Sequence, residues 1–130
     1  MPSYNQDIWK IAKDNDNFRH EILTNEHSQL VVMSVEPGDD IGEEVHEVDQ
    51  VLCFIAGSGE AVLNGERSEV KAHSLVMVPA GTTHNFINTG DTPLKLFTIY
   101  APPEEEPGTL HRTKAEAVAA EKKAKAEGEK

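Results

Sequence analysis

Two short segments of this sequence bring together side chains that can bind a metal ion. Residues 43–50 read EEVHEVDQ and residues 82–85 read TTHN, and each segment holds a histidine beside apolar stretches. Residues two apart in an extended chain point to the same side, so Glu44 and His46 can face one interior together. Two imidazoles and a carboxylate suit a first-row divalent metal and leave coordination positions open for water or substrate.

Composition alone favours a different interpretation of these segments. Acidic runs are usually solvated, and two histidines by themselves are weak support for a metal. A carboxylate buried without an ion would lose its hydration at a high cost in free energy. The segments therefore either hold a metal or belong to a solvent-exposed loop.

Short β-strands are the elements that must position these residues. Alternating, β-prone runs separated by polar or Gly-containing turns predict strands at residues 19–23, 29–35, 50–56, 60–63, 74–78, 84–88 and 94–100. Asn64-Gly65 is a strong hairpin signal, because both central positions of a type I′ turn need a positive φ. Many short strands without intervening helices predict an antiparallel sandwich or barrel and exclude a βαβ fold.

The chain of 130 residues has the length of one domain. We divide it into a lead-in segment (1–17) with a short helix, a β-barrel (18–101), a Pro/Glu-rich linker (102–112) and a helical, partly frayed tail (113–130). The three prolines of the linker remove backbone donors, so the sheet is expected to end before it. Thr113 and Glu116 read as a capping box that opens the tail helix. No function is predicted for the tail.

The fixed spacing of the two segments resembles the two motifs of the cupin superfamily. The first motif is matched by Gly38, Glu44, His46, Gln50 and Gly57, and the second by His73, Pro79, Gly81, His84 and Asn88. The sequence departs from the family pattern at three positions, where Glu44 replaces a histidine, Gln50 a glutamate and His73 a glycine. The first two replacements leave the charge of the site unchanged, and His73 is expected to serve in a turn.

The resemblance implies an all-β, double-stranded β-helix (a jelly-roll barrel) that holds one divalent transition metal, either Fe, Mn, Ni, Co or Zn. By the same resemblance the ligands are Glu44, His46, Gln50 and His84. Gln50 is either a ligand or a group that orients a neighbour or a bound water. Inward-facing strand positions are expected to line a mostly apolar cavity or to pack as plain core, and these are Gln29, Met33, Phe54, Phe86 and Tyr100.

The sequence is similar to small bacterial cupins that are compared with mannose-6-phosphate isomerase, a kinship of fold that does not establish a reaction. Two function classes stay open. One is a metal-dependent enzyme of isomerase, lyase or dioxygenase type that acts on a small oxygen-containing substrate. The other is a non-catalytic module that binds or senses a metal or small ligand. The family resemblance also implies a homodimer.

Charge and hydropathy narrow the range of partners that this protein is expected to bind. The formal net charge of −11 argues against binding to nucleic acid or to an anionic membrane surface. No apolar run approaches the about 18 residues that a membrane span needs, and residues 1–7 lack a basic segment followed by an apolar one. We therefore expect a cytoplasmic protein whose partner is a small molecule.

Overall fold

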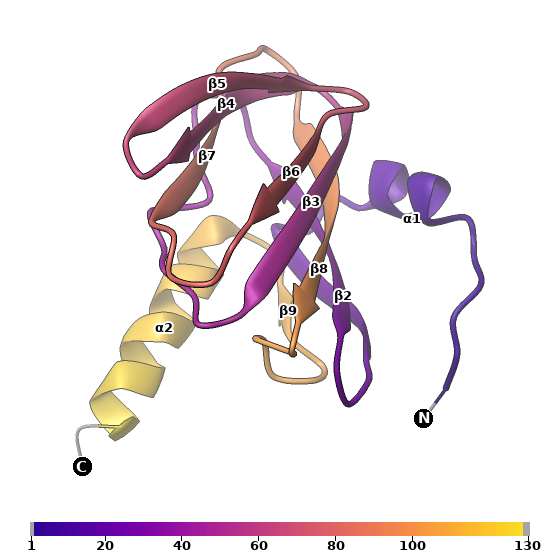
Figure 1. The fold of residues 1–130 in the computed structure, drawn as a ribbon, viewed down its shortest axis with the longest axis vertical. Coiled ribbons are helices and arrows are strands. Elements are labelled where there is room, and N and C mark those ends of the chain that lie inside the picture. Colours follow the sequence, from indigo (N-terminus) through magenta and orange to yellow (C-terminus); the bar gives the residue numbers. More distant parts are fainter. Residues whose placement is uncertain (1, 129–130) are drawn as a thin grey trace.

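The computed structural model describes residues 2–128, whose strands form two β-sheets that face each other as a barrel (Figure 1). The expected all-β jelly-roll architecture is confirmed. The elements in chain order are α1 (Ile8–Asp14), β1 (Arg19–Thr24), β2 (Gln29–Val35), β3 (Asp49–Ala56), β4 (Ser58–Leu63), β5 (Glu66–Lys71), β6 (Leu75–Val78), β7 (His84–Asn88), β8 (Leu94–Ala101), β9 (Leu110–His111) and α2 (Lys114–Gly128).

The larger sheet has the order β6-β3-β8-β2-β1-β9 and the smaller one the order β5-β4-β7. All pairings within them are antiparallel. The long connection between β2 and β3 runs beside β7, which it meets at two isolated bridges, Asp40 with Ile87 and Glu44 with His84. This connection therefore carries Glu44 and His46 to the start of β7, where His84 lies.

The core lies between the two sheets, because inward and outward residues alternate along the strands. Leu52 and Phe54 of β3 meet Phe86 of β7 in one continuous apolar cluster. Strand β2 is buried along most of its length, since α1 covers the outer face of the larger sheet and packs Ala12 against Val32 and Phe97. One apolar helix face thus closes the side of the sheet that would otherwise meet water.

Turn chemistry agrees with the sequence at two places. Asn64 and Gly65 both have positive φ, 49° and 83°, as a type I′ hairpin turn requires, and they join β4 to β5. His73 has a φ of 79°, so it serves in the turn before β6 as expected. The hairpin signal implies a strand after Gly65, and β5 is that strand. Its bounds were not predicted, because Val70 is its only buried residue.

The prediction that the sheet ends before residue 102 is wrong. After the proline-rich stretch the chain returns to the larger sheet, where Leu110 and His111 pair with His20 and Arg19 as the edge strand β9. Prolines bar the residues that carry them from a central strand, but they do not prevent later residues from pairing at an edge. A strand of two residues also has no periodicity that a sequence pattern could reveal.

Helix α2 begins as the capping box predicts, with the Glu116 backbone N–H donating to Thr113 Oγ1 (3.2 Å). It continues as regular helix past Lys122 to Gly128. Ala117 is buried against the barrel core, and Lys114 pairs with Asp39 and Asp40 of the β2–β3 connection. None of the helices among residues 2–128 is long and apolar enough to cross a membrane.

Candidate metal centre

Backbone pairing between the β2–β3 connection and β7 places the first two site residues side by side. The Glu44 N–H donates to the His84 carbonyl and the His84 N–H donates to the Glu44 carbonyl, both at 2.9 Å. Side chains of such a directly opposed pair lie on the same side of the sheet. His46 follows two residues after Glu44 and is held by a hydrogen bond from the Gly81 N–H to its carbonyl (2.8 Å).

The structure brings Glu44, His46 and His84 together at one end of the barrel. The atoms with which these three side chains could bind a metal all lie within 4.8 Å of one another. The two imidazole centroids are 5.2 Å apart, and His46 Nε2 lies 3.5 Å from Glu44 Oε2. Both histidines are buried, with 8% of His46 and 3% of His84 exposed. This arrangement is a cluster of three potential ligands, of which the two histidines are buried and Glu44 is partly exposed.

Hydrogen bonds at Nδ1 orient both rings. His84 Nδ1 lies 2.9 Å from the Thr82 carbonyl. Because a carbonyl oxygen only accepts hydrogen bonds, Nδ1 carries the proton and Nε2 keeps a free lone pair. His46 Nδ1 lies 3.1 Å from the Glu104 carboxylate. His46 Nε2 is buried and, among residues 2–128, has no hydrogen-bond partner.

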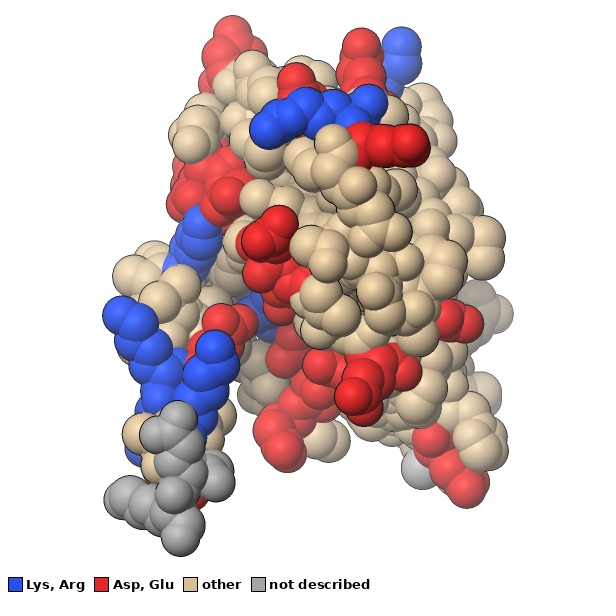
Figure 2. All heavy atoms as spheres, turned by 60° about the vertical axis from the view of Figure 1, so that its left-hand side comes forward, with Lys and Arg blue, Asp and Glu red and all other residues tan. Residues whose placement is uncertain are grey.

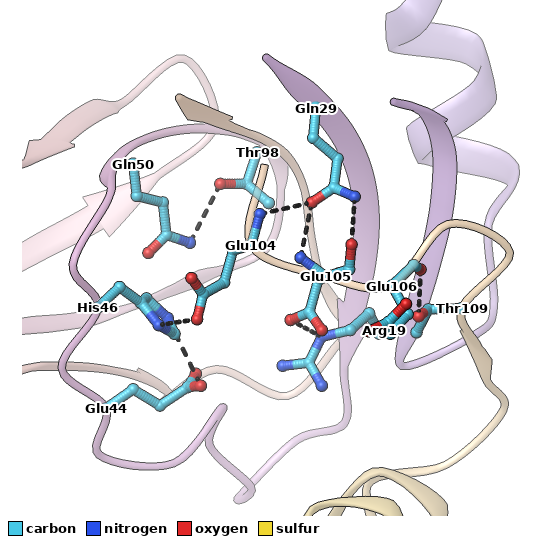
Figure 3. A network of polar contacts seen from close by, with 10 residues as sticks. All are labelled: Arg19, Gln29, Glu44, His46, Gln50, Thr98, Glu104, Glu105, Glu106 and Thr109. Atoms are coloured by element: carbon cyan, nitrogen blue, oxygen red, sulfur yellow. Dashed lines mark hydrogen bonds and ion pairs between the residues drawn. The ribbon is translucent and has the colours of Figure 1, made fainter. Parts of the chain in front are cut away.

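Gln50, the fourth predicted ligand, is buried on β3 with its amide orientation determined by Thr98 (Figure 3). Thr98 Oγ1 donates to the Val51 carbonyl (2.9 Å), so its oxygen accepts from Gln50 Nε2 (3.1 Å). Gln50 Oε1 is then left buried and without a hydrogen-bond partner in the described part of the chain.

The pKa of Glu44 indicates that the protein alone does not fully compensate the negative charge of this carboxylate. Burial raises the pKa of Glu44 to about 7, and the neighbouring positive charge of Arg19 offsets only part of that effect. Glu121 of α2 and Glu105 raise this pKa further. A bound cation would favour the ionised carboxylate. Two imidazole lone pairs, one carboxylate and an orphaned amide oxygen therefore fit a divalent metal.

Acidic groups also spread over the surface around this end of the molecule. Figure 2 shows acidic side chains on the lower part of the barrel and basic side chains gathered on α2. A negative surface raises the local concentration of cations.

The residues predicted to line a cavity are all buried. Met33, Phe54, Phe86 and Tyr100 belong to the continuous core, and the rings of Tyr100 and His46 pack nearly perpendicular to each other at a centroid distance of 5.7 Å. The amide of Gln29 is instead engaged by other parts of the chain. Its Nε2 donates to Thr24 Oγ1 and to a backbone carbonyl of the 102–109 segment, and its Oε1 accepts two backbone N–H groups from the same segment.

That segment, residues 102–109, which we call the strap, lies within the predicted linker, but its contacts with the site were not predicted. It brings Glu104 to His46 and Glu105 to the buried Arg19, whose Nε lies 3.3 Å from Glu105 Oε1 (Figure 3). A Pro/Glu-rich stretch has the composition of a solvated linker, and it lies outside both spacing motifs. No signal in the sequence therefore connected the strap with the site.

Comparisons with known proteins agree with this architecture. A family model described as the cupin domain matches residues 31–100. The uncharacterised protein YrkC of Bacillus subtilis is 48% identical over 122 residues, which cover 88% of this chain but only 65% of that protein. A Thermotoga maritima protein named as an oxalate-binding protein is 26% identical over 80 residues, which cover 61% of this chain and 66% of that protein.

Among solved structures, a crystal structure of a Bacillus halodurans protein superposes with a TM-score of 0.89 at 39% identity, covering 91% of this chain and 95% of that one. The family model spans more than half of the chain, and both spacing motifs lie entirely within its limits. The chain belongs to the cupin family.

Proposed function

We propose that this protein binds one divalent transition metal, Fe, Mn, Ni, Co or Zn, through Glu44, His46 and His84, with Gln50 as a fourth ligand or as the group that orients a bound water. The observation that carries the proposal is the convergence of three ligand atoms within 4.8 Å in a buried site. Two orphaned acceptors, His46 Nε2 and Gln50 Oε1, support it. A buried acceptor without a partner costs about 1–3 kcal/mol, and a metal ion would supply the missing interaction.

The favoured function is a metal-dependent enzyme that acts on a small oxygen-containing substrate. A metal held by three or four protein groups keeps open positions and supplies Lewis-acid polarisation of a substrate oxygen. The chain itself contributes the orientation of the ligands and a buried, mostly apolar surrounding. Small carboxylates such as oxalate are the first ligands to test, because one relative is named for binding oxalate.

Non-catalytic binding is the second candidate, and the other carboxylates of the 43–50 segment favour it. Glu43, Glu47 and Asp49 are all exposed, so none adds an acid or base to the buried cluster. The carboxylate of Asp49 accepts a hydrogen bond from the Ala80 N–H (3.0 Å) outside the site. Retention of a small ligand without turnover would support this second function.

Metal analysis of loaded, gel-filtered protein tests the site. We expect about one divalent ion per chain in the unsubstituted protein, and a loss of that ion in Glu44→Ala and His84→Ala, since each removes one ligand. Glu43→Ala is the matched control, because Glu43 is the exposed neighbour of Glu44. Circular dichroism would establish that each variant is folded. Unchanged metal content in both site variants would contradict the proposal.

The reaction class requires a separate assay of the metal-loaded protein. Dioxygen uptake with keto acids and phenols, run in parallel with sugar isomerisation and with oxalate decarboxylation, would separate the enzyme classes from one another. Tight oxalate binding without turnover in any of these assays would favour the binding module. The homodimer and the cytoplasmic location stay predictions.

A further inference from the structure

We propose that Glu104 is a positioning residue of the metal centre, which holds the His46 ring so that Nε2 faces the metal. The inference rests on the proposed metal site. It assigns a role to the strap, a segment separated from His46 by more than half of the barrel sequence. The relevant contact joins Glu104 Oε1 to His46 Nδ1 at 3.1 Å across 58 residues of chain.

The two nitrogens of His46 face different groups. Nδ1 faces Glu104, whereas Nε2 lies 3.5 Å from Glu44 Oε2 in the ligand cluster (Figure 3). A neutral imidazole carries one proton, so a proton that Nδ1 donates to Glu104 leaves Nε2 with a free lone pair. Without Glu104, the Glu44 carboxylate would be the remaining acceptor beside the His46 ring, and it would favour the tautomer with the proton on Nε2. That tautomer cannot bind a metal through Nε2.

His84 provides an internal comparison. Its Nδ1 faces the Thr82 carbonyl at 2.9 Å, an acceptor that belongs to the backbone of the same loop. His46 obtains the equivalent acceptor from a side chain on the strap. Histidine ligands generally donate their second ring N–H to a carboxylate or a backbone carbonyl, and loss of that partner typically weakens metal binding by about 10–100-fold.

The strap is held in place by polar side chains of β1 and β2. Gln29, which is 2% exposed, accepts the backbone N–H groups of Glu104 (3.1 Å) and Glu105 (2.8 Å) and donates to the Glu105 carbonyl (2.7 Å). Glu21 accepts the Gly108 N–H (2.9 Å) near the other end of the strap. These contacts determine the backbone position of Glu104, and therefore the reach of its carboxylate toward His46.

Stability alone does not account for the Glu104 contact. The contact joins a neutral imidazole to a carboxylate that is 32% exposed, so water can replace Glu104 as the partner of His46 Nδ1 and the contribution of the contact to folding is small. A purely structural contact of this size would leave the affinity of a preformed metal site unchanged. A positioning role predicts a loss of metal affinity with little loss of fold stability.

The first test measures the affinity for Zn²⁺ and Co²⁺ by chelator competition in the full chain. We expect binding about 10-fold or more weaker in Glu104→Ala, with an intermediate value for Glu104→Gln, whose amide oxygen still accepts the Nδ1 proton. Glu106→Ala is the matched control, because Glu106 is an exposed acid of the same strap. The visible spectrum of bound Co²⁺ should change in Glu104→Ala and not in the control. Equal affinities and spectra in Glu104→Ala and the unsubstituted protein would overturn the proposal.

The second test needs no metal. The ¹⁵N chemical shifts of His46 in the metal-free protein report its tautomer at mildly alkaline pH, where imidazoles are neutral. We expect the Nδ1–H form in the unsubstituted protein and a shift toward the Nε2–H form in Glu104→Ala. An unchanged tautomer in this variant would contradict the role of Glu104. If instead the unsubstituted protein binds no metal while the tautomer shifts, the proposed function fails and the orienting contact stands.

Discussion

At the residue scale, the site is defined by which atoms are already hydrogen-bonded and which are not. The Thr98 hydroxyl donates its proton to the Val51 carbonyl, so its oxygen can only accept a hydrogen bond from Gln50. Because Gln50 Nε2 points to Thr98, Gln50 Oε1 points away from it. This oxygen is buried and has no hydrogen-bond partner among residues 2–128. An amide in place of the usual family carboxylate therefore has a determined orientation, although either end of an amide could in principle face the site.

Removing the Gln50 oxygen should weaken the metal site. We expect Gln50→Leu to lower metal affinity by about 10-fold, since the variant loses a ligand or a group that orients one. Thr98→Val keeps the amide but removes the group that orients it, so its effect should be smaller. Chelator competition measures both. Metal affinities that match the unsubstituted protein in both variants would show that Gln50 has no part in the site.

At the element scale, the barrel depends on tight corners where the chain passes from one sheet to the other. Gly57 connects β3 of the larger sheet to β4 of the smaller one, with a φ of 89°. A Cβ at this position would lie 2.6 Å from the Pro93 carbonyl oxygen and 2.9 Å from Leu94 Cα. The corner thus requires glycine both for its backbone conformation and for the close approach of β8.

A pair of glycine variants separates these two requirements. Gly65→Ala should cost about 1 kcal/mol, because Gly65 has a φ of 83° but an added Cβ would meet nothing within 4 Å. Gly57→Ala should cost about 1–3 kcal/mol more, since backbone atoms must also move apart. Urea unfolding of the two variants gives the comparison. Equal losses of stability would show that the contact with Pro93 is relieved at no cost.

At the scale of the whole molecule, the C-terminal helix is joined to the loop that carries Glu44. Lys114 pairs with Asp39 (3.0 Å) and Asp40 near the start of the β2–β3 connection. Burial alone would raise the pKa of Asp40, but hydrogen bonds from Lys114 and Asn85 hold that pKa below its ordinary value. Two segments distant in the sequence are thereby linked.

This link predicts a pH dependence of folding stability. A depressed aspartate pKa contributes stability above the unfolded pKa near 3.8, and the contribution is lost as the pH falls through the lower folded pKa. Lys114→Met should therefore cost at most about 1 kcal/mol at neutral pH, because the pair is partly exposed. The difference from the unsubstituted protein should shrink in acid.

Urea unfolding at neutral pH and below the ordinary aspartate pKa measures this difference. Lys10→Met is the matched control, since Lys10 pairs with Asp14 within one exposed helix and does not connect two distant segments. Its stability loss should be smaller than that of Lys114→Met. A Lys114→Met deficit that stays constant into acid would contradict the role of the Asp40 pair.

The sequence by itself determined the short antiparallel strands and the shared side of Glu44 and His46. Both follow from local rules, because strand alternation has a fixed period and turn residues require particular backbone angles. The hairpin at Asn64-Gly65 was predictable on the same grounds, whereas the turn at His73 was expected from the glycine that the family motif has at this position. The spacing of residues 38–88 carried the remaining information through its resemblance to a family.

Tertiary structure alone decided the strap, the edge strand β9 and the orientation of Gln50. The contact of Glu104 with His46 spans 58 residues, and that of Gln50 with Thr98 spans 48. Such contacts depend on where the chain returns after leaving the sheet, and no local pattern encodes that path. The burial of Gln29 and Arg19 could be explained only once the strap was placed over them, since buried polar groups need partners that the fold supplies.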